Sequence, residues 1–205
     1  IHQNLSLNAL GKIPSMDMIC IDGDHNWYTI YHELKILEKT IQDGESFPCV
    51  FLHDTQWPYG RRDVYYNPEC IPEIYRQPYK KDSISHAHSC LGGVGINQTD
   101  NNSVYENSLR NGVKTAIEDF LKETPLDLHY REISGFHGLG IIMTSQQKEL
   151  LSSFLQDLTV PDVIGMHIQQ LEEERCSLKA ASESKTHDLQ NLKKTHLCIQ
   201  KSFLK

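Results

Sequence analysis

Two short apolar runs separated by one amphipathic segment constrain the fold of this chain more than any other feature. The first run is Met16–Ile21 and the second is residues 48–52, and an aspartate-bearing turn follows each directly. Between them, apolar residues recur at helical spacing from Asn26 to Ile41, and Gly44 follows at a typical position for a helix end. This order predicts a βαβ unit whose two strands are parallel neighbours in one sheet.

Three later segments extend the predicted sheet. Residues 111–122 follow a helical period, residues 126–133 alternate between apolar and polar side chains, and residues 138–143 form another apolar run. A short turn joins the last two segments, which favours an antiparallel pair, so we expect a mixed sheet. Residues 55–109 show no regular period, and so long a loop inside a domain is typical of a lid or binding segment.

The charge of the chain is unevenly distributed. Its 205 residues carry a formal charge of −7, and residues 1–145 hold 12 basic against 19 acidic side chains. This acidity argues against nucleic acid or an anionic membrane as the main partner. No apolar run approaches the ~20 residues that a membrane-spanning helix needs. The six cysteines include no CxxC pair, as in a reducing compartment. We therefore predict a cytoplasmic protein.

Residues 146–205 differ from the rest, because their basic and acidic side chains balance at eight each. Apolar residues from Ile164 to Phe203 follow an alternating four-three spacing. Polar side chains interrupt this seam at four positions: Arg175, Ser182, Lys185 and His196. We expect an α/β domain over 1–145 and a helical tail over 146–205. The tail is either a coiled coil that self-associates through 164–203 or a solvated helix or linker.

Acidic and histidine side chains follow both strands of the predicted βαβ unit. Asp22 and His25 come after the first strand, and Asp54 comes after the second. Ligands of open α/β sheets bind beyond the carboxyl ends of the strands, where two carboxylates suit a divalent cation such as Mg²⁺. His25 is then a candidate general base beside the metal. A lone aspartate here would more often cap the next helix, but the three residues together favour a site.

The long loop contains aromatic and basic side chains suited to a substrate. Trp57 and Tyr65 offer flat faces for a sugar or aromatic ring, and Arg61 and Arg62 are suited to hold an anionic group. In the alternative interpretation, the aromatic side chains pack the loop onto the domain and the arginines pair with nearby acids. The sequence leaves both interpretations open.

The run Ile21-Asp22-Gly23-Asp24-His25-x-x-Tyr28, a helix, and then Leu52-His53-Asp54-Thr55 resemble the second half of class I S-adenosylmethionine-dependent methyltransferases. The similarity is greatest to enzymes that modify sugars, polysaccharides or antibiotics, and it covers roughly residues 5–145. It implies the C-terminal part of a Rossmann-like methyltransferase sheet, with the last strand antiparallel. It also implies S-adenosylmethionine as cofactor and, in metal-dependent members, Asp22 and Asp54 as ligands of Mg²⁺ with His25 as the base.

One part of the family pattern is missing. No strand with a Gly-rich cofactor turn precedes Asp22, so the cofactor-binding residues are unknown. We expect a fragment of a longer O-methyltransferase for sugar or glycan hydroxyls, inactive by itself and a poor binder of S-adenosylmethionine. Two alternatives stay open. One is a metal-dependent glycosyltransferase, suggested by Asp22-Gly23-Asp24, and the other is a non-catalytic interaction module built on the coiled-coil tail.

Overall fold

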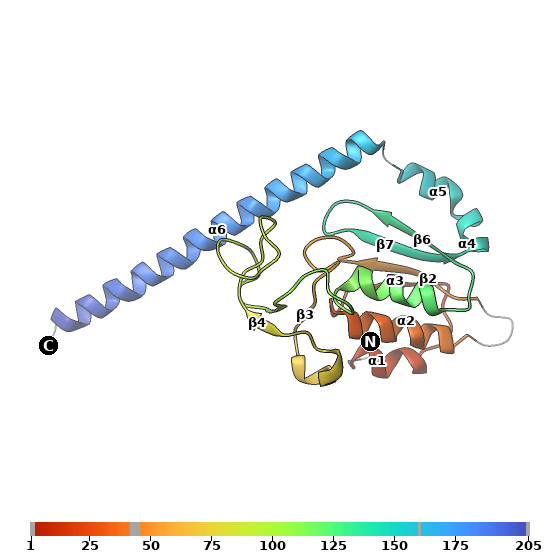
Figure 1. Ribbon diagram of the computed structural model, residues 1–205, viewed down its shortest axis with the longest axis horizontal. Helices are drawn as coiled ribbons and strands as arrows, with labels where there is room; N and C mark the ends of the chain where they lie inside the picture. Colours follow the sequence, from red (N-terminus) through yellow and green to blue (C-terminus); the bar gives the residue numbers. More distant parts are fainter. Residues whose placement is uncertain (1–2, 42–45, 160, 204–205) are drawn as a thin grey trace.

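The computed structural model describes residues 3–41, 46–159 and 161–203, which form an α/β body and a long C-terminal helix (Figure 1). The chain begins with α1 (Ser6–Ala9) and η1 (Leu10–Lys12), followed by β1 (Met18–Ile21), α2 (Trp27–Lys39) and β2 (Cys49–His53). The predicted βαβ unit is confirmed, because β1 and β2 pair in parallel. The predicted helix end at Gly44 lies outside the described residues.

The main sheet has the strand order β1-β2-β7-β6, where β6 is Leu128–Ile133 and β7 is Leu139–Thr144. β7 is antiparallel to both of its neighbours, so the prediction of a mixed sheet is confirmed. Helices α2 and α3 (Val113–Glu123) cover one face of the sheet (Figure 1). Helices α4 (Ser145–Leu150) and α5 (Ser152–Asp157) lie against the other face, although both fall within the predicted tail.

The sequence of α2 explains its place in the body. The side chain of Asn26 accepts a hydrogen bond from the Thr29 N–H at 2.9 Å and so caps the helix. Ile30, Leu34 and Leu37 follow at spacings of four and three residues and are all buried against the sheet. Burial of such side chains stabilises the helix by roughly 1.5–3 kcal/mol each.

Residues 55–109 are ordered, which corrects the expectation of a loop without regular structure. They form a second, antiparallel sheet in the order β3-β5-β4, with β3 at Val64–Tyr65, β5 at Asn101–Ser103 and β4 at Tyr79–Lys81. Two short 3₁₀ turns, η2 (Pro68–Cys70) and η3 (Glu73–Tyr75), lie between β3 and β4. Strands of two or three residues are too short to show a period in the sequence, and side-chain hydrogen bonds supply much of the order.

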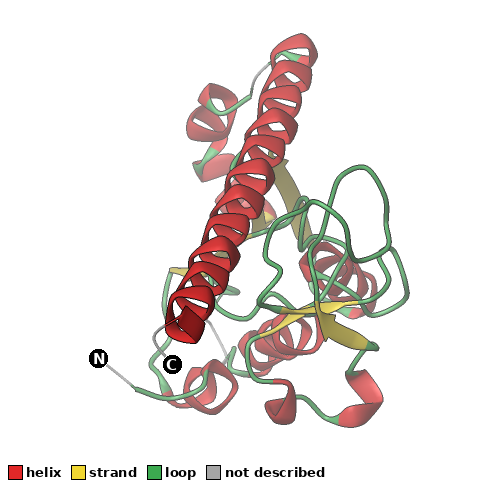
Figure 2. Ribbon diagram, turned by 90° about the vertical axis from the view of Figure 1, so that its left-hand side faces the viewer, coloured by secondary structure: helices red, strands yellow, loops and turns green. Residues whose placement is uncertain are grey.

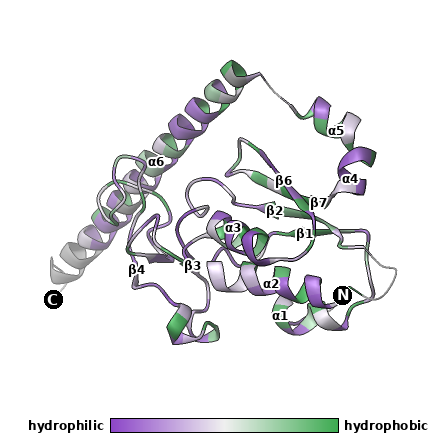
Figure 3. Cartoon of the chain, turned by 45° about the vertical axis from the view of Figure 1, so that its right-hand side comes forward, coloured by the Kyte–Doolittle hydropathy of each residue, from purple (hydrophilic) through white to green (hydrophobic). Residues whose placement is uncertain are grey.

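The last element is α6 (Asp162–Phe203), which confirms the prediction of a long C-terminal helix. Figure 2 shows it as one unbroken helix that runs past the loops of the body. Cys176 and Ala180 are its buried side chains, and Ala180 packs with Tyr59, Ile84 and Ile96 of the 55–109 segment. Hydrophilic residues dominate α6 in Figure 3, with hydrophobic residues recurring along it. No described helix has the length and apolar character that a membrane crossing requires.

Glu33 makes the stability of the body depend on pH. Its side chain is buried on α2 with Oε2 lacking a hydrogen-bond partner, and burial raises the pKa of its carboxyl to about 7. The folded state therefore holds the proton to a higher pH than the unfolded state does. Stability from this group is lost as the pH rises from the ordinary value of 4.5 through 7, by up to ~3 kcal/mol.

We expect Glu33→Gln to raise the free energy of unfolding by ~2–3 kcal/mol at pH 8.5 and by less than ~1 kcal/mol at pH 5, because the amide has no charge to desolvate. Urea denaturation at the two pH values measures this difference. Glu149→Gln, at an exposed position of α4, is the matched control and should change neither value. An equal effect of Glu33→Gln at both pH values would contradict the assignment.

Candidate metal centre

Four side chains with metal-binding atoms meet at one end of the main sheet. Asp22 follows β1, His53 ends β2 and Asp54 follows it, while His25 lies just before α2. Because β1 and β2 are parallel neighbours, their carboxyl ends share one edge of the sheet. One ligand atom from each of the four residues lies within 4.8 Å of all the others.

The separations within this cluster match those around a bound metal ion. His25 Nε2 lies 3.3 Å from Asp22 Oδ1 and 3.1 Å from Asp54 Oδ2. His53 Nδ1 lies 3.3 Å from Asp22 Oδ1 and 3.0 Å from Asp54 Oδ2. A point equidistant from four atoms at such separations lies about 2 Å from each, the usual bond length for zinc with nitrogen and oxygen ligands. The cluster thus has the dimensions of a site for one ion.

The charges of the cluster also call for a cation. Asp54 is 5% exposed, and among the described residues its ion-pair contacts are only to His25 and His53. Asp22, by contrast, is exposed and opens the cluster to solvent. Two carboxylates that face one point need positive charge, which either a protonated imidazole or a metal ion provides.

Two tyrosines surround His25. The Tyr66 hydroxyl lies 3.3 Å from His25 Nδ1, and the ring of Tyr59 stacks on the imidazole with 5.9 Å between centroids. Burial, and next to it the negative charge of Asp54, raises the pKa of the Tyr66 hydroxyl, which therefore stays protonated. A hydroxyl at Nδ1 orients the ring so that Nε2 points to the carboxylates, the usual arrangement of a metal-binding histidine.

The structure brings together the three residues that the sequence singled out here. Binding of a metal by Asp22 and Asp54 remains a prediction. His25 was predicted as a general base beside the metal, but its Nε2 lies among the ligand atoms, which makes it a candidate ligand. His53 was not predicted as a ligand, although its place directly before Asp54 at a strand end is a usable signal.

The predicted substrate-binding residues of the long loop are engaged within the protein, which corrects that prediction. Tyr65 is buried and donates to Asp63, and the buried Arg62 donates to the carbonyl oxygens of Ser103 and Ser89. Two further side chains have partners in the body: Arg61 pairs with Glu118 through two bonds of 2.6 Å, and Trp57 stacks on His86 at 3.5 Å. These contacts hold the loop to the body.

Comparison with known proteins gives one relative. It is the polypeptide designated E among the subunits of the V-type proton ATPase from Mesembryanthemum crystallinum, and it is 27% identical over 132 residues. The matched residues are 58% of this chain and 57% of the relative, so the chain matches little more than half the length of that protein. No family model matches the chain. No solved structure matches it either.

This relative contradicts the predicted activity. A protein named as a subunit of a proton ATPase is not an S-adenosylmethionine-dependent methyltransferase, so the prediction of an O-methyltransferase is wrong. The predicted partners are corrected as well. A protein partner within a complex replaces the small-molecule or glycan substrate and the self-association through 164–203. Of the functions considered from the sequence, the interaction module agrees with this finding.

Proposed function

We propose that this chain is a subunit of a multi-protein assembly of the V-type proton ATPase kind, and that α6 binds a helix of a different subunit. The observation that carries this proposal is the exposed apolar face of α6. Leu178 is 73% exposed and Leu192 is 66% exposed, and Leu171 on the same register is also exposed. Intervals of seven and fourteen residues place the three leucines along one seam of the helix.

The attachment of α6 to the body leaves this seam open. Cys176 and Ala180 bury against the 55–109 segment, whereas Leu178 lies between them in sequence. Residues two positions apart on a helix differ by about 200° in direction, so the leucine seam and the buried side chains occupy opposite faces. The body thus holds α6 by one face and presents the other to a partner helix.

The proposal is tested on the assembly itself. We expect the chain to copurify with the V-type proton ATPase of the organism that encodes it, because the seam buries against a partner helix. Leu178→Glu combined with Leu192→Glu should abolish copurification, since both place a charge in that interface. The matched control is Gln190→Glu, which adds a charge to α6 outside the seam. Equal retention of the seam variant and the control contradicts the proposal, as does absence of the wild-type chain from the purified ATPase.

A second function is favoured by one specific observation, the four short separations between the Asp22, His25, His53 and Asp54 ligand atoms. We propose that this cluster binds one divalent transition-metal ion, such as Zn²⁺ or Mn²⁺. Two imidazoles are poor ligands for Mg²⁺, which prefers oxygen. Calorimetric titration of the metal-free chain with each ion should give one site, with Zn²⁺ bound more tightly than Mg²⁺.

The fold of the body supports a related proposal about its origin. We propose that residues 5–145 share their fold with the second half of the class I methyltransferase sheet, without the activity. Support comes from the parallel pair β1 and β2, the connecting helix α2, and the antiparallel last strand β7. A solved structure with unrelated strand order would contradict it.

A further inference from the structure

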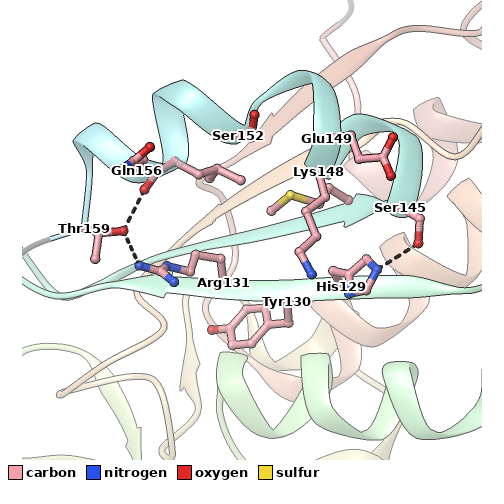
Figure 4. A pocket seen from close by; sticks show the side chains of 11 residues that line it. His129, Tyr130, Arg131, Ser145, Lys148, Glu149, Ser152, Gln156 and Thr159 are labelled. Atoms are coloured by element: carbon pink, nitrogen blue, oxygen red, sulfur yellow. Dashed lines mark hydrogen bonds between the residues drawn. The ribbon is translucent and has the colours of Figure 1, made fainter.

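A pocket of about 660 Å³ lies between the main sheet and helices α4 and α5 (Figure 4). Its volume falls within the ~300–1,000 Å³ that is usual for sites of small molecules. Met143, near the end of β7, lines this pocket, whereas Leu139 at the start of β7 pairs with His53 of the candidate metal centre. The pocket is therefore at the opposite end of the sheet from that centre.

The polar side of the pocket is positively charged. Figure 4 shows Lys148 reaching from α4 toward β6, where Arg131 lies. Arg131 donates to the Thr159 hydroxyl at 2.6 Å, a neutral partner that leaves its charge unbalanced. Among the described residues neither Arg131 nor Lys148 forms an ion pair, and Glu149 is the one acidic side chain in the lining. Two cations at one opening favour an anionic group, and the planar fork of an arginine suits a carboxylate.

The inner side of the pocket is apolar. Met143 is buried on β7, and Leu155 of α5 packs with it and with Ile141. An aliphatic chain placed against these side chains would lose contact with water, which stabilises binding by roughly 25 cal/mol per Å² of apolar area. A ligand that fits both sides has a charged head and an apolar body.

We propose that this pocket binds a carboxylate with an aliphatic chain of medium length. Its head lies between Arg131 and Lys148, and its chain lies against Met143 and Leu155. This proposal does not depend on the function of α6 or on the metal centre, because none of their residues lines the pocket.

Methyl NMR on the full chain with labelled methionines tests the proposal, since the sequence has only four methionines. Octanoate is the probe, and 1-octanol and acetate each supply one half of its chemistry. We expect octanoate to shift the Met143 methyl signal, assigned with Met143→Leu, and to bind at least tenfold more tightly than either half. Arg131→Gln with Lys148→Gln should weaken octanoate binding at least tenfold, whereas Lys122→Gln, on the other face of the sheet, should not.

Each other outcome overturns the proposal in a defined way. Equal binding of 1-octanol shows a purely apolar cavity, and equal binding of acetate shows an anion site without a chain pocket. An unshifted Met143 signal places the ligand elsewhere. Unchanged octanoate affinity in the double variant removes the two cations from the site, and the chemical shifts of the other methionines report whether that variant is folded.

Discussion

Replacing Asp63 with alanine is expected to lower the free energy of unfolding by about 4 kcal/mol or more. The carboxylate is fully buried, and its Oδ1 accepts the N–H groups of Trp27 at 2.7 Å and Gly112 at 2.6 Å. Its Oδ2 accepts the Tyr65 hydroxyl at 2.7 Å. The side chain thus joins the starts of α2 and α3 to β3, and its loss leaves three buried donors without an acceptor, each costing ~1–3 kcal/mol.

The Asp63 carboxyl is ionised when it makes these contacts. Burial raises its pKa to about 6, while the donated hydrogen bonds of Gly112, Tyr65 and Trp27 act against that rise. Glycine is required at position 112, because its φ is +93° and a Cβ there would lie 2.5 Å from the Gly60 oxygen. The two starting helices therefore converge on Asp63 with little freedom to rearrange after its loss.

Urea denaturation of the variants measures the effect, and a graded series keeps it interpretable if Asp63→Ala does not fold. Asp63→Asn retains an oxygen for the two N–H groups but turns an NH₂ toward the Tyr65 hydroxyl, so we expect a smaller loss of ~1–2 kcal/mol. Asp82→Ala, whose carboxylate pairs with Lys80 at the surface, is the control and should cost less than ~1 kcal/mol. A loss of that small size for Asp63→Ala would contradict the account.

Removing one ligand of the candidate metal centre is expected to reduce Zn²⁺ affinity at least 100-fold. Changes to residues that merely orient the ligands cost about 10–100-fold in other metal sites, and Asp54 and His53 each supply an atom of the cluster itself. Calorimetric titration of Asp54→Ala and His53→Ala against the wild-type chain measures the loss. At 100 times its dissociation constant, the metal should stabilise the wild-type fold by about 2.7 kcal/mol, which thermal unfolding detects independently.

The matched control is His88→Ala, because His88 lies exposed on the 55–109 segment outside the cluster. It should retain full Zn²⁺ affinity and full stabilisation. With eleven histidines in the chain, adventitious binding is the main competing explanation. Equal losses in the control and in His53→Ala, or no loss in either, would show that the ion binds elsewhere.

The sequence predicts the main sheet well because its elements are long enough to show a period. Trp27–Lys39 buries every third or fourth residue, and the runs that became β1 and β2 are apolar and end at aspartates. The same logic located Asp22, His25 and Asp54, since parallel neighbours end at one edge of the sheet. The role of His53 was missed, because the last residue of a strand is assigned to the strand before its side chain is considered.

The 55–109 segment was not predictable by periodicity. Its order comes from buried polar side chains such as Arg62, whose guanidinium binds carbonyl oxygens more than 25 residues away in sequence. A basic residue in a loop is indistinguishable in sequence from a ligand-binding one, so Arg62 was assigned to a substrate. The polar seam position Arg175 has a similar explanation, because Arg175 lies 3.1 Å from His137 of the body rather than facing a partner helix.

The central claim is that the exposed seam of α6 contacts a different subunit of a V-type proton ATPase. A photo-crosslinking side chain at Leu192, within the assembly, tests it most directly, with the same group at Lys194 as control. Both positions are exposed, but they lie about 200° apart around the helix. We predict an adduct with one ATPase subunit, identified by mass spectrometry, from position 192 and none from position 194. Equal adducts from both positions, or an adduct with a second copy of this chain alone, would contradict the claim.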